Sequence, residues 1–438
     1  MKQALEYLIG DFLERDLPKF TRRSFDLEPV PGKALALIGM RRVGKTYLCY
    51  QAMQTILDKG VPKDNILYLN FEDDRLYGFQ LADCQAILDV FYAQRPQKKS
   101  EHCTFFFDEI QNVRHWERFI RRLIDTENVS VYVTGSSARL LSLEIATALR
   151  GRSLDREVFT FSFEEFLRAH SVPINLSRVG SKTRLLLNQH ADMYCRMGGF
   201  PEIQPFEVNR RREIIQSYVD AVVLRDVVDR HGVSNVESLR ALVYHVLRNP
   251  ATKLSVNKFY LDLKSRGLRI SKDDLYAFLR HLTDAFLLFQ VPLWSRSEKK
   301  RQVNPKKMYV IDNGVLDAYS TNLTADHGAF LENLVFQTLR RQGLEIGYYL
   351  TKRRREIDFV YRLNEETYLI QVAWTLDNDL TRERELRALR EAAAELNQPK
   401  CLIVTLNEEW VSDENDVEVI PLWKFLLGGD FYSDDTVN

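Results

Sequence analysis

Long apolar runs are missing from this sequence. No segment approaches the roughly 18 consecutive apolar residues that a membrane-spanning helix needs. The opening stretch, MKQALEYLIGDFLERDLPKF, has acidic residues where a secretory signal needs an unbroken apolar core. We therefore expect neither export nor a membrane partner.

Cysteine is scarce and scattered. The five cysteines contain no CxxC pair, and no His-rich spacing typical of a metal site accompanies them. This usage favours reduced thiols in the core, so we expect a cytoplasmic protein.

An excess of charge of either sign is also absent. The 61 basic and 61 acidic side chains give a formal net charge of zero, so any attraction to nucleic acid must come from local patches. Hydrophobic residues make up 45% and charged residues 28% of the chain, which is typical of a soluble globular protein. At 438 residues the chain is too long for one core, and we expect several domains.

Residues 1–155 contain apolar runs that end in polar side chains. ALALI, NILYLNFEDD, CTFFFDEIQNV and SVYVTGSS each resemble a buried strand, and helical segments lie between them. We predict an α/β fold whose parallel sheet gathers its polar chemistry at the carboxyl ends of the strands.

The string GMRRVGKT fits the P-loop pattern GxxxxGKT. Gly39 and Gly44 allow backbone N–H groups to approach phosphates, Lys45 reaches the β- and γ-phosphates, and Thr46 offers a hydroxyl to Mg²⁺. Arg42, inside the loop, could touch a nucleotide or a partner. The string lies between a predicted strand and a predicted helix, whose positive N-terminal end adds to the attraction.

FFFDEIQ supplies a second signal of the same kind. Asp108 at the end of a buried strand would bind Mg²⁺ through water, and Glu109 would orient or deprotonate the attacking water. A strand that happens to end in an acidic turn is the alternative.

Further polar residues follow in TGSS and LRGRS. Thr134 and Ser136 are candidates to sense the γ-phosphate, although a hydroxyl at a strand end is as often a helix cap. Arg150 or Arg152, acting in its own chain or on a neighbouring one, would stabilise charge during phosphoryl transfer. A solvated surface arginine is an equal alternative for each.

The remainder of the chain is predicted to form three more domains. Residues 156–235 are a helical lid interrupted by the turn MGGFPE, residues 236–320 a winged helix, and residues 325–427 a domain of strands and two helices. Ser271 and Asp274 approximate a capping box at the start of the third helix of the winged helix. RSEKKRQVNPKK would be a basic wing tip, suited to a phosphate backbone.

Several strings taken together resemble one family. GMRRVGKT, FFFDEIQ, TGSSARLLSLEIATALRGRS, FSFEEFL, GGFPE and YVDAVVLRD occur in the order found in bacterial and archaeal AAA-type ATPases with a winged-helix and restriction-endonuclease-like C-terminal region. The resemblance implies ATP and Mg²⁺ as cofactors at the positions above, with slow or regulated hydrolysis.

The same resemblance implies a degenerate nuclease-like site. Active restriction-endonuclease cores gather metal with an acidic residue on the first helix, an Asp on the second strand and an acidic-x-Lys triplet on the third. The matching residues are Glu332, Asp358 and Gln371, with Ala373 in place of the lysine. We expect little or no DNA cleavage, unless Lys352 or one of the arginines after it restores the missing charge.

Two functions stay open. In the first, nucleotide state controls a C-terminal region that binds DNA or RNA through the wing tip and the basic string TKRRR. In the second, the chain is a nucleotide-dependent signalling switch or scaffold for a protein partner, as its zero net charge and the acidic start of the third winged-helix helix favour. Assembly of several copies is compatible with both.

Overall fold

The computed structural model describes residues 1–136, 151–173, 179–320, 327–397, 399–414 and 416–428. The chain divides into two compact units. The first contains residues 1–159 with 284–286, and the second contains the described residues of 160–283 and 287–438. The predicted ATPase core lies in the first unit and the bulk of the other three predicted domains in the second, so the boundaries among those three stay predictions.

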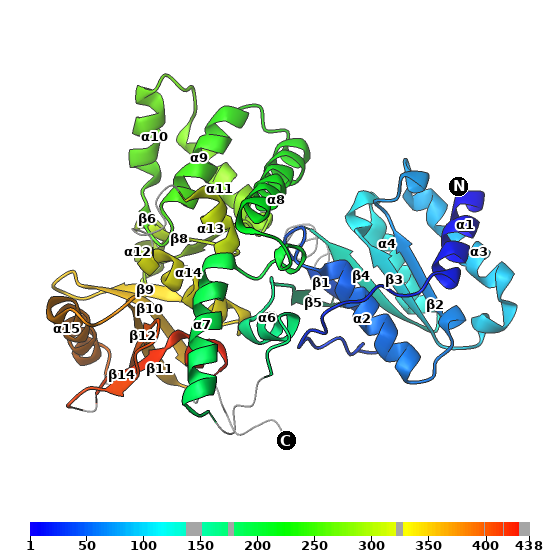
Figure 1. Ribbon diagram of the computed structural model, residues 1–438. Coiled ribbons are helices and arrows are strands. Elements are labelled where there is room, and N and C mark those ends of the chain that lie inside the picture. The colour runs from blue at the N-terminus through cyan, green and yellow to red at the C-terminus, as the bar shows by residue number, and fades with distance from the viewer. Residues whose placement is uncertain (137–150, 174–178, 321–326, 398, 415, 429–438) are drawn as a thin grey trace. The chain divides into compact units, whose positions relative to one another are not determined.

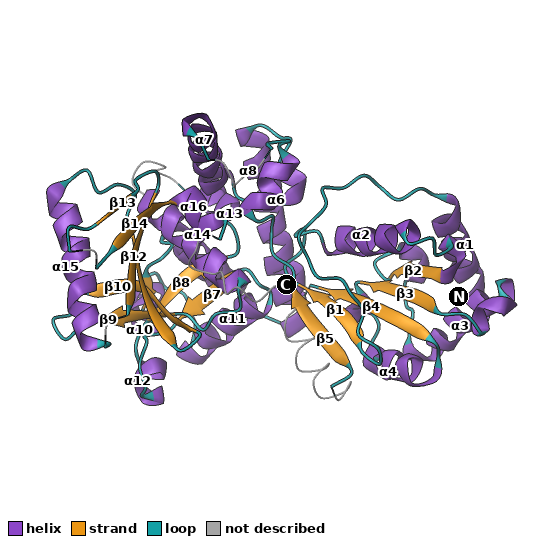
Figure 2. Cartoon of the chain, turned by 90° about the horizontal axis from the view of Figure 1, so that it is seen from below, coloured by secondary structure: helices purple, strands orange, loops and turns teal. Residues whose placement is uncertain are grey.

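A five-stranded parallel sheet forms the centre of the first unit (Figures 1 and 2). Its order is β2-β3-β4-β1-β5. The strands are β1 (Ala34–Ile38), β2 (Ile66–Asn70), β3 (Cys103–Asp108), β4 (Val129–Gly135) and β5 (Ser153–Glu157). Every residue of β1 and β3 is buried, as expected of central strands covered on both faces. The parallel α/β fold predicted from the sequence is therefore confirmed.

Helices cover this sheet, as Figure 2 shows. They are α1 (Lys2–Glu14), α2 (Lys45–Asp58), α3 (Cys84–Gln94) and α4 (Trp116–Thr126). In α4 the apolar residues Trp116, Phe119, Ile120 and Leu123 recur at helical spacing and are all buried, while charged residues occupy the positions between them. The strand β5 was not expected from the sequence, because four of its five residues, SLDRE, are polar and the strand is only half buried at the sheet edge.

The second unit begins with helices. They are α6 (Phe163–Ala169), α7 (Ser181–Met197) and α8 (Val208–Ala221), and α8 continues as a π-helix over Val222–Asp229. The predicted turn MGGFPE follows α7, where Gly198 has a φ of 75°. A Cβ atom on Gly198 would lie 1.8 Å from the Asp312 carboxylate, so this close approach requires glycine.

A small antiparallel sheet and three helices follow in the order expected of a winged helix. The helices are α9 (Val236–Arg248), α10 (Val256–Ser265) and α11 (Lys272–Asp284), and the sheet β6-β8-β7 consists of β6 (Lys253–Leu254), β7 (Leu288–Val291) and β8 (Lys306–Val310). Ser271 and Asp274 exchange the hydrogen bonds of the predicted capping box at α11. The expected wing loop contains a short helix, α12 (Glu298–Val303), that the sequence did not indicate.

The last part of the second unit is a mixed sheet of six strands with the order β13-β14-β12-β11-β10-β9. Its strands are β9 (Gly347–Leu350), β10 (Glu356–Leu363), β11 (Glu366–Val372), β12 (Lys400–Thr405), β13 (Trp410–Val411) and β14 (Glu418–Pro421), and its helices are α13 (Asn313–Tyr319), α14 (His327–Arg341), α15 (Asp379–Glu395) and α16 (Leu422–Leu426). Figure 1 shows α15 beside this sheet. Among the described helices, none combines the length and apolar character that crossing a membrane requires.

Candidate active site

The P-loop connects β1 to α2, as the sequence predicted. Gly39 packs so tightly that a Cβ atom would lie 2.4 Å from the carbonyl oxygen of Val158. Gly44 caps α2 with a φ of 98°, a conformation that favours glycine. Lys45 and Thr46 are the first residues of α2, so both lie at the helix end where unpaired N–H groups and the helix dipole attract anions. Arg42 is exposed on the loop, with a φ of 68°.

The ammonium of Lys45 is folded back over the P-loop. Its side chain is 4% exposed, and its Nζ atom donates hydrogen bonds of 3.1 Å to the carbonyl oxygens of Gly39 and Met40. The same Nζ lies 3.5 Å from Glu109 Oε1. The lysine is therefore held at the P-loop by two carbonyl oxygens and the carboxylate of Glu109.

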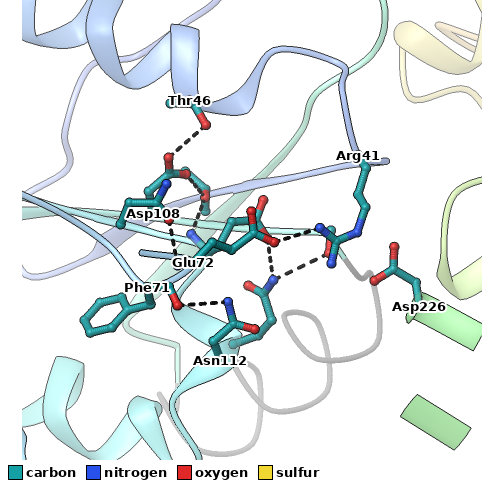
Figure 3. Close-up of polar contacts among 12 residues, drawn as sticks. Arg41, Thr46, Phe71, Glu72, Asp108, Asn112 and Asp226 are labelled. Carbon is teal, nitrogen blue, oxygen red and sulfur yellow. Dashed lines mark hydrogen bonds and ion pairs between the residues drawn. The ribbon is translucent and has the colours of Figure 1, made fainter. Parts of the chain in front are cut away.

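Asp108 links the end of β3 to α2, β2 and β4 through hydrogen bonds. This carboxylate ends β3 and is completely buried. Its Oδ2 atom accepts a hydrogen bond of 2.8 Å from the Thr46 hydroxyl (Figure 3). Oδ2 also accepts one of 2.9 Å from the Tyr68 hydroxyl on β2, and Oδ1 accepts one from Thr134 on β4. Burial and then the charge of Glu109 raise the pKa of Asp108, while these three donors oppose that shift.

Glu109 follows directly, with a φ of 51° that turns the chain sharply at the end of β3. Its backbone N–H donates to the Thr134 hydroxyl at 2.9 Å, and its carboxylate accepts a short hydrogen bond from Gln111. Burial alone would raise the pKa of Glu109, but the charge of Lys45 and the hydrogen bond from Gln111 outweigh it and lower the pKa. The group is therefore ionised at neutral pH, as a general base must be.

A second layer of polar contacts surrounds these residues. Arg41 donates to Glu72 at 2.8 Å, and Asn112 donates to the carbonyl oxygen of Phe71 at 3.2 Å (Figure 3). Ser136, fully buried, accepts a long hydrogen bond of 3.5 Å from Gln111. Behind the P-loop, Cys49 on α2 is also fully buried, and burial followed by the charge of Asp108 raises the pKa of its thiol well above the ordinary value.

Two members of this site were missed in the sequence. Tyr68 and Gln111 contact Asp108 and Glu109, although neither belongs to the P-loop pattern. A signal existed for Tyr68, since a tyrosine inside a buried strand needs a partner for its hydroxyl. Gln111 is found only through the turn that follows β3, which brings its amide back to Glu109.

The two candidate arginines have different outcomes. Arg150 lies outside the described residues. Arg152 immediately precedes β5, where its carbonyl oxygen accepts a hydrogen bond from the N–H of Ala34 and its guanidinium pairs with Asp125 at 2.8 Å. Ala34 begins β1, whereas the P-loop follows the end of β1. Arg152 therefore lies at the amino ends of the strands, and the P-loop lies at their carboxyl ends. The role of Arg152 in phosphoryl transfer stays a prediction, and this position favours a role on a neighbouring copy over one in its own chain.

The three nuclease-like residues do come together in the second unit. Asp358 on β10 receives a backbone N–H from Val372 at 3.0 Å and donates its own backbone N–H to Gln371 Oε1 at 2.7 Å. Glu332 on α14 joins them through Lys307, which contacts both carboxylates.

The cation in this cluster is not one that the sequence suggested. Lys352 and the two arginines after it are exposed, and Arg355 pairs with Glu391 at 3.0 Å. Lys307, assigned from the sequence to a solvent-facing wing tip, is instead buried. This corrects the expected wing tip, because one of its six basic residues faces the interior.

Three family models match successive parts of the chain. A family model described as an AAA domain matches residues 31–167. Two families described as domains of unknown function, DUF8612 and DUF4143, match residues 188–326 and 327–425.

Relatives of similar length exist in an archaeon and a bacterium. The uncharacterized protein MJ1544 of Methanocaldococcus jannaschii is 34% identical, covering 97% of this chain and 96% of its own. An uncharacterized protein of Haemophilus influenzae is 29% identical, covering 89% of this chain and 93% of its own. Among solved structures, the ORC2 protein of Aeropyrum pernix is 12% identical with a TM-score of 0.38, covering 66% of this chain and 86% of that one.

Proposed function

Since this chain belongs to the family of AAA-domain proteins that includes MJ1544 of Methanocaldococcus jannaschii, we propose that its P-loop binds ATP with Mg²⁺ and hydrolyses it. The observation that carries this proposal is the 2.8 Å hydrogen bond between Thr46 and Asp108. Thr46 at the start of α2 and Asp108 at the end of β3 would hold the metal ion, and Glu109 follows Asp108 in the chain.

The donor set fits Mg²⁺. A hydroxyl and a carboxylate supply the oxygen ligands that this ion prefers, and the ion usually takes the rest from water and phosphate. When bound, Mg²⁺ would neutralise charge that develops on the phosphates. The chain's own contribution is to hold Thr46 and Asp108 together before the nucleotide arrives.

Three further residues would act on the nucleotide. Lys45 would exchange its carbonyl partners for the β- and γ-phosphates, and the backbone N–H groups from Gly39 to Thr46 would surround those phosphates. Once Lys45 has moved, Glu109 loses its nearest positive charge and is available to take a proton from the attacking water. Thr134, which contacts both Asp108 and Glu109, would report the state of the γ-phosphate to β4.

Binding and hydrolysis can be tested separately. We expect Lys45→Ala to abolish binding of a fluorescent ATP analogue. Among residues 39–46, all of which the structure describes, Lys45 is the only buried cation. We expect Glu109→Gln to bind ATP normally and to release no phosphate in a single turnover. Normal turnover by Glu109→Gln would remove Glu109 from its assigned role.

We further propose that nucleotide state controls nucleic-acid binding by the second unit. Support comes from Arg296, Lys299 and Lys300, which are exposed around α12. These side chains are suited to contacts with a phosphate backbone, which supply affinity without reading sequence. Asp274 caps α11 and keeps its negative charge, so we place the phosphate contacts at α12 and not at the start of α11.

A protein partner is the second candidate function. It is favoured by the reduced charge of the wing tip, where Lys307 is buried and Arg301 pairs with Glu345 at 2.5 Å. Measuring the ATPase rate with and without DNA separates the two candidates, since only a nucleic-acid-controlled ATPase should respond to DNA.

A further inference from the structure

Lys307 on β8 reaches into the nuclease-like site. Its Nζ atom lies 2.5 Å from Glu332 Oε1, 2.9 Å from Glu356 Oε1 and 3.1 Å from Asp358 Oδ1. The lysine side chain is 3% exposed. One ammonium group is thus surrounded by three carboxylates in the interior of the second unit.

The orientation of β8 explains this placement. Side chains alternate between the two faces of a strand, so Lys307 and Tyr309 point to the same side. Both contact the same atom, because the Tyr309 hydroxyl donates to Glu332 Oε1 at 2.6 Å. Three carboxylates lie within 3.1 Å of the Lys307 Nζ atom, and this arrangement favours a charged ammonium group.

The other ligand atoms of the site also have partners within the chain. Asp358 Oδ2 accepts a backbone N–H from Val372, and Gln371 Oε1 accepts the backbone N–H of Asp358. The amide nitrogen of Gln371 donates to Glu385 at 2.5 Å, which fixes the direction in which the amide points.

These contacts do not fit a divalent cation. A restriction-endonuclease-like site needs carboxylate oxygens that are free to converge on the ion at about 2.0–2.1 Å for Mg²⁺. Here the oxygens of Glu332, Glu356 and Asp358 already converge on an ammonium group. Within the described part of the chain, no group of three acidic, His or Cys residues is arranged to hold a metal ion.

We propose that the ammonium of Lys307 takes the place of the metal ion in this site. The positive charge of this site is then supplied by a side chain of the protein itself. The site therefore does not support metal-dependent cleavage of nucleic acid. This inference concerns the second unit and is independent of ATP hydrolysis in the first.

The replacement also joins two sheets. Lys307 belongs to the three-stranded sheet, whereas Asp358 belongs to the six-stranded sheet. Two neighbouring hydrogen bonds strengthen the same junction. The backbone N–H of Trp294 donates to the carbonyl oxygen of Tyr348 at 2.7 Å, and the Tyr348 hydroxyl donates to the carbonyl oxygen of Pro305 at 2.7 Å. The winged-helix-like region and the nuclease-like sheet should therefore move as one body.

Manganese binding to the full chain without nucleotide tests the proposal, with free Mn²⁺ followed by its EPR signal. We expect the wild-type chain and Asp358→Asn to bind Mn²⁺ equally, since no site depends on Asp358. Lys307→Ala uncovers three carboxylates and should gain one Mn²⁺ per chain, which Lys307→Ala/Asp358→Asn should lose. Lys253→Ala is the matched control, because Lys253 pairs with Glu356 at the half-exposed rim and its removal leaves Lys307 in place.

Three results would overturn the proposal, two from Mn²⁺ binding and one from DNA cleavage. One is an Mn²⁺ site in the wild-type chain that Asp358→Asn abolishes, and another is a Lys307→Ala variant, folded by circular dichroism, that gains no Mn²⁺. If Lys307→Ala does not fold, the comparison of wild type with Asp358→Asn still decides. Cleavage of supercoiled DNA that disappears in Asp358→Asn would also overturn it, and would make Lys307 a relocated catalytic lysine.

Discussion

The hydroxyl of Thr46 donates a 2.8 Å hydrogen bond to Asp108 across 62 residues of sequence. The contact exists because β1 and β3 are parallel strands with only β4 between them, so the residues that follow their carboxyl ends meet at one edge of the sheet. The chain thus arranges both proposed metal ligands through its fold alone.

Thr46→Val tests whether this pair holds Mg²⁺. Valine keeps the shape of threonine but has no oxygen to bind the ion, so ATP affinity should lose its dependence on Mg²⁺. We expect affinity in the presence of Mg²⁺ to fall about tenfold or more, which corresponds to about 1.4 kcal/mol. Titration calorimetry with and without Mg²⁺ measures this. Thr55→Val, in the same helix but bonded to the carbonyl of Gln51, is the control and should behave as wild type.

Gln111→Ala tests the support of the proposed general base. Gln111 lowers the pKa of Glu109, so its loss should raise that pKa and move the acidic limb of the kcat profile to higher pH. At neutral pH we expect kcat to fall about tenfold with little change in KM, because the amide contacts the base and not the phosphates. An unshifted pH profile would mean that Gln111 has no positioning role.

The pH dependence of stability should reveal Glu332. Burial, and then the charge of Asp358, raise the pKa of Glu332 to about 7 from an ordinary value of 4.5. A carboxyl group with a raised pKa binds its proton more tightly in the folded state, so its contribution is complete below the unfolded pKa and is lost as pH rises towards 7. Between pH 4.5 and 7.5 this group should cost at most about 3 kcal/mol of unfolding free energy.

Urea unfolding at those two pH values, on wild type and Glu332→Gln, isolates this contribution. The pKa of Glu356 is lowered, mainly by Lys307 against the effect of burial, so it contributes in the opposite sense in both proteins and largely cancels in the comparison. Wild type should lose more stability than Glu332→Gln as pH rises. Parallel losses in the two proteins would contradict the assignment.

The role of the exposed wing-tip cations in DNA binding can be tested, with Arg301 in the same loop as the control. If nucleic acid binds there, replacing Arg296, Lys299 and Lys300 by alanine should weaken DNA binding and reduce the slope of log affinity against log salt by about 2.7, or about 0.9 per phosphate contact. Arg301→Ala should have a smaller effect, because Arg301 pairs with Glu345. Fluorescence anisotropy at several salt concentrations measures both. Negligible binding by the wild-type chain would favour a protein partner.

The first unit is readable from the sequence because its signals are local. The apolar runs that end near Ile38, Asp108 and Thr134 identify strand ends, and a parallel sheet brings the carboxyl ends of its strands to one side. The strand β5 escaped because an edge strand buries few side chains, so SLDRE lacks an apolar pattern. The position of Arg152 could not be predicted for the same reason, since without β5 nothing shows that it precedes a strand.

The second site depends on contacts that no local pattern carries. Lys307 stands in a basic string, and only its place in β8 decides that it faces inward while Lys306 does not. Its partners come from α14 and β10, which follow in sequence but pack on it through the fold. The sequence therefore indicated Glu332, Asp358 and the missing lysine of the triplet, but neither Glu356 nor the lysine that lies among these carboxylates.

Because Cys49 is buried behind the P-loop, the rate at which it is labelled can report how often the nucleotide site opens. A fully buried thiol with a raised pKa has almost no reactive thiolate, so alkylation of Cys49 requires α2 to open locally. Cys401 is only partly buried and should be labelled first in the intact protein. The slower alkylation rate of Cys49 then measures how often the P-loop opens. A ligand that binds only the closed P-loop should reduce this rate in proportion to the fraction of protein that is bound.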